Sequence, residues 1–387
     1  MTLKVVAAFV PLVDAAVLVA ARERGFAAGE GLDLVLVKEP SWASLRDHLL
    51  LGHVDCAHAL APLPIASTLG VGHVQVECVV PFVLSRGGNA VTVSRRLYAE
   101  MLDAADGEAL STPRVAGAAL AAAARGRTEP LTLAMVFPFS SHNFDLRYWL
   151  AASGLHPDRD VRIVAIPPPL MVESLRAGHV DGFCVGEPWS SRAVAEGLGA
   201  IVATRRQLAP FGVEKVLAVR AELESRPATL APLLRALAAA ARWTDDPEHR
   251  RDLAALLARP EYLDTAAALI ERALAGRLAL GLHAEGADED PEFLAFARRS
   301  TNVPSAADAL FAYAQMVRWG HLRHDAHRQA RAARVFRADL YHAFVGEAPM
   351  PEPPRMFDGI ACDDDVEAYV RRFAIATPYD SLPFPAS

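Results

Sequence analysis

Two side chains stand where a strand and a helix are expected to begin, and both could bind an anion. Lys215, one of only three lysines in the chain, heads the expected strand Lys215 to Arg220. Its ammonium group is a compact point charge that can neutralise a monoanion in a cleft. His142 follows Ser140-Ser141, which can cap a helix, so its imidazole N–H and free backbone amides can converge on one oxygen. The alternatives are a solvated histidine and a surface Glu214–Lys215 pair.

Four further candidates stand at expected strand ends or crossings. Trp42 directly follows Ser41, a candidate N-cap, and Asn89 follows Gly87-Gly88, where glycines would let the backbone hinge while the amide meets a ligand. The alternatives are that Trp42 packs at the surface and that Asn89 lies in an ordinary turn. Gly186 and Glu187 end another strand, and Glu187 is expected to hold a cationic partner more than to contact an anion.

The neighbours Glu214 and Lys215 compete for one role. Successive residues of a strand point to opposite faces, so only one of the two is expected to enter the cleft. We favour Lys215 because its charge suits an anion.

The sequence does not favour other kinds of chemistry. No G-x-S-x-G, Walker A or G-x-G-x-x-G pattern follows a strand, so neither a hydrolase nor a nucleotide-binding protein is indicated. His321, His324 and His327 are spaced by three on an expected helix, which suits a solvated face, so we expect no metal site. His142 is the lone acid–base candidate, and we expect neither an enzyme nor a cofactor.

The composition is that of a globular protein. The chain has 387 residues, 52% of them hydrophobic, and 46 acidic against 39 basic residues. At about 100–200 residues per domain it can form two or three cores. Its net charge of −7 disfavours direct binding of nucleic acid. Four scattered cysteines without a C-x-x-C pair fit reduced thiols in a reducing compartment.

The first residues predict a strand and a helix instead of a secretory signal. Pro11 and Asp14 interrupt the apolar stretch Val5 to Ala21, so we expect a strand Lys4 to Val10 followed by a helix capped by Asp14. No later segment offers about 18 apolar residues for a membrane span. The expected location is the cytoplasm, unless the true start lies upstream.

An internal repeat predicts the architecture. The pattern that begins near Val6 recurs near Leu133, and Gly52-His53-Val54-Asp55 returns as Gly178-His179-Val180-Asp181. Each copy predicts a β-α-β-α-β unit with a parallel sheet. Two such units imply two α/β lobes that face each other, with a ligand beyond the carboxyl ends of the strands, where helix N-termini favour an anion.

The domain organisation follows from this repeat. We expect residues 1–95 to form the first part of lobe I and residues 96–214 to form lobe II. Residues 215–387 are expected to return to lobe I and to continue as a helical C-terminal extension. The clearest helical stretches are Thr229 to Arg242, His249 to Leu257, Leu263 to Leu278 and Ser305 to Trp319, and the Pro-rich tail from Pro349 is expected to wrap the surface.

At these strand ends the chain resembles the nitrate/bicarbonate-binding proteins of ABC uptake systems, which have the type 2 periplasmic-binding-protein fold. The resemblance covers nearly the whole chain. The matching stretches are Phe9 to Asp14, Glu39 to Asp47, Ala57 to Pro64, Gly88 to Ser94, His142 with Leu146 to Leu150, Gly182 to Trp189 and Ala314 to Gly320.

The resemblance also implies roles for individual residues. The family's tryptophan at the position of Trp42 and its histidine at that of His142 contact the anion. Nitrate binders use a lysine in the region of Lys215, whereas bicarbonate binders use a glutamate. Phe139 and Ser140 stand where the family usually has glycines, so the approach of the backbone to the anion is expected to differ.

Family members without an export signal resemble cytoplasmic nitrate/nitrite sensors that hold an RNA-binding antitermination protein inactive until the anion binds. The first hypothesis is therefore a cytoplasmic sensor in which nitrate or nitrite closes the lobes and changes the surface presented to a protein partner of antiterminator type. The alternatives are a substrate-binding receptor of a nitrate or bicarbonate uptake system and a biosynthetic enzyme on the same fold. The sequence leaves nitrate, nitrite and bicarbonate open.

Overall fold

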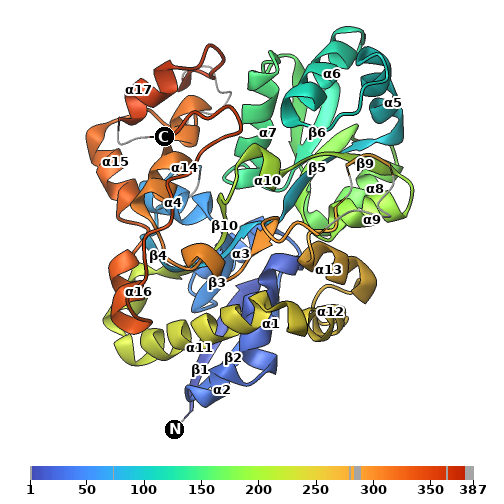
Figure 1. Ribbon diagram of the computed structural model, residues 1–387. Coiled ribbons are helices and arrows are strands. Elements are labelled where there is room, and N and C mark those ends of the chain that lie inside the picture. The colour runs from blue at the N-terminus through green and yellow to red at the C-terminus, as the bar shows by residue number, and fades with distance from the viewer. Residues whose placement is uncertain (1, 73, 279, 283–288, 363–364, 380–387) are drawn as a thin grey trace.

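Two β-sheets, each flanked by helices, organise the chain in the computed structural model (Figure 1). The structure describes residues 2–72, 74–278, 280–282, 289–362 and 365–379. In Figure 1 the blue strands of the first sheet lie in the lower half and the green and teal strands of the second in the upper right. The observed fold is the expected α/β arrangement of two lobes.

The first sheet forms the first lobe and combines strands from three parts of the chain. Its order is β11-β4-β10-β3-β1-β2. Strand β1 pairs in parallel with both β2 and β3, while β10 runs antiparallel to β3 and β4. The strands are β1 (Leu3–Phe9), β2 (Leu32–Lys38), β3 (Cys56–Leu60), β4 (Cys78–Gly87), β10 (Val213–Arg220) and β11 (Leu294–Ala295).

The second sheet forms the second lobe and repeats the pairing of the first. Its order is β7-β6-β8-β5-β9, and β6 pairs in parallel with β7 and β8 as β1 does with β2 and β3. The strands are β5 (Asn89–Ser94), β6 (Leu131–Met135), β7 (Val161–Ala165), β8 (Gly182–Gly186) and β9 (Gly199–Thr204).

The aspartates of the repeated motif explain why the repeat is visible in the sequence. A carboxylate oxygen of Asp55 accepts the Val6 N–H at 2.9 Å, and one of Asp181 accepts the Thr132 N–H at 2.9 Å. Each carboxylate thus pairs with an amide of the first strand of its own unit. The expected internal repeat is confirmed.

Two helices of the lobes begin at the polar caps that the sequence predicts. Ser41 Oγ accepts the Ser44 N–H at 3.1 Å, and Ser140 Oγ accepts the Asn143 N–H at 3.1 Å, as expected. The helices are α1 (Ala16–Glu23), α2 (Phe26–Gly29), α3 (Trp42–Leu50), α4 (Pro62–Leu69), α5 (Arg95–Ala104), α6 (Pro113–Arg125), α7 (Ser141–Ala152), α8 (Met171–Arg176), α9 (Trp189–Ala195) and α10 (Arg205–Leu208), with the 3-10 turns η1 (Val13–Ala15) and η2 (Pro168–Leu170).

One expected cap is wrong. Asp14 lies inside η1 and caps neither that turn nor α1, because its carboxylate is engaged by Lys215 and His58. An ion pair to a distant strand has replaced the local hydrogen bond.

The crossings between the lobes lie slightly earlier than expected. Strand β5 pairs with β8 and β9 of the second sheet, so the chain crosses at Gly87-Gly88 and not after residue 95. The return begins at Val213, so the expected boundary after residue 214 falls inside β10. Gly87 and Gly88 have φ values of 77° and 91°, which favour glycine at this crossing, and the hinge expected there stays a prediction.

The C-terminal part is helical and contacts both lobes. Tyr148 of α7 donates a hydrogen bond to Asp358 of the tail at 2.7 Å, and the Val80 N–H of β4 donates to the Val335 carbonyl at 2.7 Å. The helix expected over Leu263 to Leu278 is observed as the shorter α13. A further helix, α17, forms within the Pro-rich tail. The elements are η3 (Ala221–Ser225), α11 (Pro227–Asp245), η4 (Pro247–His249), α12 (Arg250–Leu257), α13 (Ala267–Leu274), η5 (Arg298–Ser300), α14 (Ala306–Arg318), α15 (Ala326–Ala333), α16 (Ala338–Phe344) and α17 (Val366–Arg371).

The three spaced histidines do not share a helix, because α14 ends at Arg318 and α15 begins at Ala326. Among the described residues, no group of three or more His, Cys, Asp or Glu side chains could hold a metal ion. In the same part of the chain, no helix is long and apolar enough to cross a membrane. The four cysteines are buried.

Candidate functional site

Polar and charged side chains from both lobes meet in a buried cluster between the two sheets. We call it the interlobe cluster, and each of its residues is at most 3% exposed, apart from Ser141 at 5%. Its members are Asp14, Trp42, His58, Asn89, Ser141, His142, Asp145, Arg205, Glu214 and Lys215. Four of the six expected site residues, Trp42, Asn89, His142 and Lys215, belong to it, and Gly186 and Glu187 border it.

Lys215 lies between two carboxylates. Its Nζ is 2.7 Å from Asp14 Oδ2 and 2.7 Å from Glu214 Oε1, and it lies 5.3 Å from the centroid of the Trp42 ring. Burial by itself would raise the pKa of the Asp14 carboxyl, but the charge of Lys215 and a hydrogen bond from His58 hold that pKa below its usual value. The pKa of Glu214 is lowered in the same way by Lys215, so both acids are ionised at neutral pH.

The expectation that only one of Glu214 and Lys215 enters the cleft is wrong. Both side chains are fully buried and contact each other in the cluster. The pairing of β10 with β4 shifts register on both sides of Lys215, as a β-bulge does. Such an irregularity interrupts the alternation of faces and lets two neighbours turn to one side.

Glu214 is the centre of a hydrogen-bond network. Asn89 Nδ2 donates to Glu214 Oε2 at 2.6 Å, and the Ser141 hydroxyl donates to the same oxygen. His142 Nδ1 lies 3.6 Å from Glu214 Oε1. Burial lowers the pKa of His142 to about 3 despite the nearby Glu214, so its imidazole is neutral at pH 7. One carboxylate thus joins groups from both lobes.

A second ion pair adjoins this network. Arg205 donates to Asp145, and its Nη1 lies 3.3 Å from Glu214 Oε2. Arg205 Nη2 also donates to the Val213 carbonyl at 3.1 Å. Burial raises the pKa of Asp145 to about 7, although Arg205 opposes the rise.

Asp145, Arg205 and His58 are members that sequence reasoning missed. Asp14, in the turn after β1, was expected to cap a helix and was not singled out as a site residue. Arg205 begins α10 directly after β9, and Asp145 lies in the first turns of α7, which Ser140 caps. Their closeness to a strand end and to a capped helix start could have marked them as candidates. His58 lies within β3 and offered none, because a histidine in an apolar strand is ordinary core.

Several buried polar atoms of the cluster have no hydrogen-bond partner among the described residues. They are Trp42 Nε1, His58 Nδ1, Asn89 Oδ1 and both ring nitrogens of His142. A buried polar group left unpaired costs about 1–3 kcal/mol, so such groups gathered in one place favour a polar occupant. Trp42 Nε1 and one His142 nitrogen are donors near Lys215, which suits a small oxyanion, whereas Asn89 Oδ1 is an acceptor.

Gly186 and Glu187 join the lobes next to the cluster. The Val13 N–H of the first lobe donates to the Glu187 carbonyl at 2.8 Å. A Cβ on Gly186 would lie 3.3 Å from Asn89 Oδ1 and 3.5 Å from Asp14 Oδ2, so glycine leaves room there. The cationic partner expected for Glu187 is replaced by the Ser191 amide, which donates to its carboxylate at 3.2 Å, and burial raises the pKa of Glu187 to about 7.

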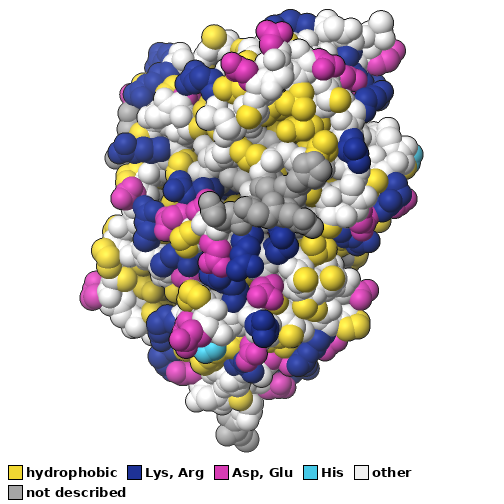
Figure 2. Space-filling model, turned by 45° about the vertical axis from the view of Figure 1, so that its right-hand side comes forward, with side chains coloured by type: hydrophobic (Ala, Val, Ile, Leu, Met, Phe, Trp, Pro, Cys, Tyr) yellow, Lys and Arg dark blue, Asp and Glu magenta, His cyan; other side chains and the backbone are white. Residues whose placement is uncertain are grey.

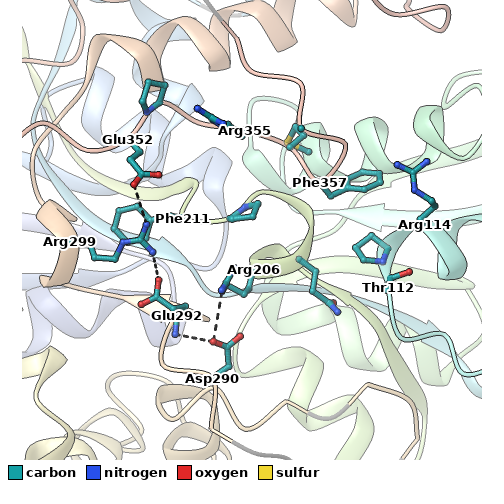
Figure 3. Close-up of a pocket in the computed structure, with 16 residues that line it drawn as sticks. Thr112, Arg114, Arg206, Phe211, Asp290, Glu292, Arg299, Glu352, Arg355 and Phe357 are labelled. Atoms are coloured by element: carbon teal, nitrogen blue, oxygen red, sulfur yellow. Dashed lines mark hydrogen bonds and ion pairs between the residues drawn. The ribbon is translucent and has the colours of Figure 1, made fainter.

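A larger cavity lies elsewhere and differs in character. It measures about 830 Å³ and is lined by α6, α10, the Phe211 turn, residues 290–299 and the tail near Met356 (Figure 3). Arg206 lies 3.9 Å from Asp290, and Arg299 lies 3.9 Å from Glu352. These four side chains are 37% to 85% exposed, so water can solvate them and no occupant is required.

The surface shows no single charged patch on the face drawn in Figure 2, where basic and acidic side chains are interspersed. That distribution agrees with the small negative net charge of the chain. The concentrated electrostatics lie inside, at the interlobe cluster.

Two α/β lobes that enclose a buried polar cluster define a ligand-binding protein with the type 2 periplasmic-binding-protein fold. The chain belongs to the NMT1-like family, whose model matches residues 2–258. It is homologous to nitrate/nitrite-binding and bicarbonate-binding proteins.

Individual relatives support this assignment. The nitrate/nitrite binding protein NrtA of Synechococcus elongatus is 32% identical over 381 residues, which are 94% of this chain and 84% of that protein. The crystal structure of the periplasmic nitrate-binding protein NrtA from Synechocystis PCC 6803 has a TM-score of 0.88 at 28% identity, over 97% of this chain and 99% of that one.

Other relatives are longer. The nitrate import ATP-binding protein NrtC of Synechocystis is 36% identical over 95% of this chain and 54% of its own length, and the bicarbonate transport ATP-binding protein CmpC of the same organism is 35% identical over 98% and 57%. The chain therefore spans about half the length of these two relatives.

Proposed function

We propose that the chain binds nitrate or nitrite reversibly in the interlobe cluster and that it is not an enzyme. The observation that carries the proposal is the buried Trp42 N–H of the first lobe and the buried His142 ring of the second, near Lys215 and without hydrogen-bond partners among the described residues. The names of the NrtA relatives support nitrate and nitrite as the ligands.

The cluster offers what a planar monoanion of low basicity needs. The indole ring of Trp42 provides a flat face, while Trp42 Nε1, His142 and Asn89 supply polar atoms and Lys215 a charge. Glu214 favours bicarbonate as a second candidate, since a bicarbonate O–H can donate to a carboxylate whereas nitrate has no donor.

Binding is coupled to lobe closure in this proposal. The cluster is buried, and groups of the second lobe such as Asn89 and Ser141 bond directly to Glu214 of the first. The lobes must therefore separate for an anion to reach Lys215. An anion that is held only by the closed form shifts the population toward it.

Calorimetric titration with nitrate, nitrite and bicarbonate tests the proposal. We expect micromolar binding of nitrate or nitrite. Trp42→Phe keeps a flat ring but loses the N–H, so the affinity should fall about 2- to 10-fold. Trp42→Leu loses both features and should bind more weakly still. No heat from any of the three anions would refute the proposed function.

We propose that closure is read by a protein partner. The first candidate is a cytoplasmic regulator of the antiterminator type, for which the chain acts as a nitrate/nitrite sensor. The second is the membrane component of a nitrate or bicarbonate uptake system, and the transport names of the relatives favour it.

Affinity capture from cells of the source organism, with and without nitrate, distinguishes these partners. Anion-dependent recovery of an RNA-binding protein from the cytoplasmic fraction supports the sensor. Recovery of a permease, or export of the chain, supports the receptor. The control is a variant that does not bind the anion.

A further inference from the structure

The interlobe cluster has no positive charge to spare for an anion. Three carboxylates, Asp14, Asp145 and Glu214, face two cations, Arg205 and Lys215. The net charge of these five side chains is −1 when all are ionised, and zero when Asp145 holds a proton. A monoanion that enters this buried site leaves at least one negative charge uncompensated, which is costly in a medium of low dielectric constant.

His142 is placed to remove that excess. Both of its ring nitrogens lack a hydrogen-bond partner among the described residues, and Nδ1 lies 3.6 Å from Glu214 Oε1. A neutral imidazole has one donor and one acceptor nitrogen, and the acceptor lone pair would repel an anion. The imidazolium has two donors, so one N–H can point to Glu214 and the other to the bound anion.

We propose that the anion enters the interlobe cluster together with one proton, which is held by His142. This inference rests on the proposed function and adds a regulatory property, namely that affinity depends on pH. The imidazolium offsets the arriving anion, so the bound cluster keeps the net charge it had before binding: −1, or zero when Asp145 holds a proton.

The groups around His142 agree with this assignment. Glu214 of β10 and Asp14 of η1 favour the imidazolium, whereas Lys215 of β10 and Arg205 of α10 oppose it. In the empty cluster burial keeps His142 neutral, with a pKa of about 3. An anion beside the ring adds a second strong favourable charge and raises that pKa.

Three other groups could take the proton. Asp145 is paired with Arg205. His58 Nε2 lies 3.0 Å from Asp14, but its Nδ1 has no partner among the described residues, and Glu187 accepts the Ser191 N–H and likewise has one oxygen without such a partner. His58 and Glu187 are therefore the rivals of His142, and His58→Gln, like Glu187→Gln, should leave the proton uptake intact.

The test is calorimetric titration with nitrate at pH 6 and 7 in buffers of different ionisation enthalpy. The buffer supplies each proton that the protein takes up, so the slope of the observed heat against the ionisation enthalpy gives the number of protons per nitrate. We expect about one proton per nitrate, and an affinity that falls about tenfold per pH unit as the pH rises. His142→Gln should bind more weakly and lose the proton uptake, whereas Glu187→Gln should keep it.

The outcomes separate this inference from the proposed function. Absence of nitrate, nitrite and bicarbonate binding at either pH refutes the function itself. Nitrate binding without proton uptake overturns the inference, as does uptake that persists in His142→Gln. Should His142→Gln not bind at all, nitrogen NMR of histidine-labelled wild-type protein decides: the nitrate-bound form must show His142 as an imidazolium, and a neutral ring overturns the assignment.

Discussion

Lys215→Met should abolish nitrate binding and lower the free energy of unfolding by about 3–5 kcal/mol. Methionine fills much of the space of the lysine stem but leaves Asp14 and Glu214 buried without the ammonium that lies 2.7 Å from each. Removal of one partner of a buried ion pair costs more than the pair contributed, because the remaining charge stays desolvated. Urea unfolding and calorimetric titration measure the two effects.

The loss of stability in Lys215→Met should also depend on pH. Without the ammonium, burial raises the pKa of Asp14 and Glu214 above their unfolded values, so the folded state binds more protons and becomes less stable as the pH rises. The variant should therefore be closer to wild type at pH 5 than at pH 8. Asp14→Asn should partly restore stability to Lys215→Met, because it removes one uncompensated charge.

Lys38→Met is the matched control for this experiment. Lys38 is exposed and donates to the Pro260 carbonyl at 2.9 Å. Its replacement should change stability by no more than about 0.5 kcal/mol and leave nitrate binding intact. Equal stability of Lys215→Met and wild type would contradict the buried ion-pair network.

Gly87→Ala should destabilise the chain by more than about 4 kcal/mol, a loss seen only for severe disruptions. Gly87 has a φ of 77°, and a Cβ there would lie 2.1 Å from the Phe293 carbonyl oxygen. That oxygen accepts the Gly88 N–H at 2.8 Å, so its displacement would break the contact between β4 and β11. Urea unfolding measures the loss, and weaker nitrate binding should accompany it because the crossing between the lobes is distorted.

Gly25→Ala isolates the steric part of this effect. Gly25 has a φ of 76°, nearly that of Gly87, but a Cβ there meets no atom within 4 Å. Gly25→Ala should therefore lower the free energy of unfolding only by the penalty for a left-handed backbone, about 1–2 kcal/mol. If Gly87→Ala and Gly25→Ala lost the same stability, the proposed clash at the crossing would be wrong.

Local patterns predicted the architecture well. The Gly-His-Val-Asp repeat identified two equivalent units because Asp55 and Asp181 each bond to a nearby first strand. Ser41 and Ser140 marked helix starts because an N-cap hydrogen bond spans only a few residues. The positions of Trp42 and His142 at those starts followed, and both residues lie in the interlobe cluster.

The charge balance of the cluster could not be predicted in this way. Asp14 looked like a helix cap, and its true partner Lys215 is about 200 positions further along the chain. Strand alternation predicted a choice between Glu214 and Lys215, but the shifted register of β10 against β4 brings both inward.

The sequence by itself determined the two α/β units, the order of their elements and the strand ends where the site lies, because hydrophobic period and capping act over a few residues. Only the tertiary structure decided which carboxylates surround Lys215, that Arg205 joins them and that the His142 ring has no hydrogen-bond partner among the described residues. Those contacts join residues that are far apart in the chain, and their energies depend on burial, which arises only when the two lobes meet.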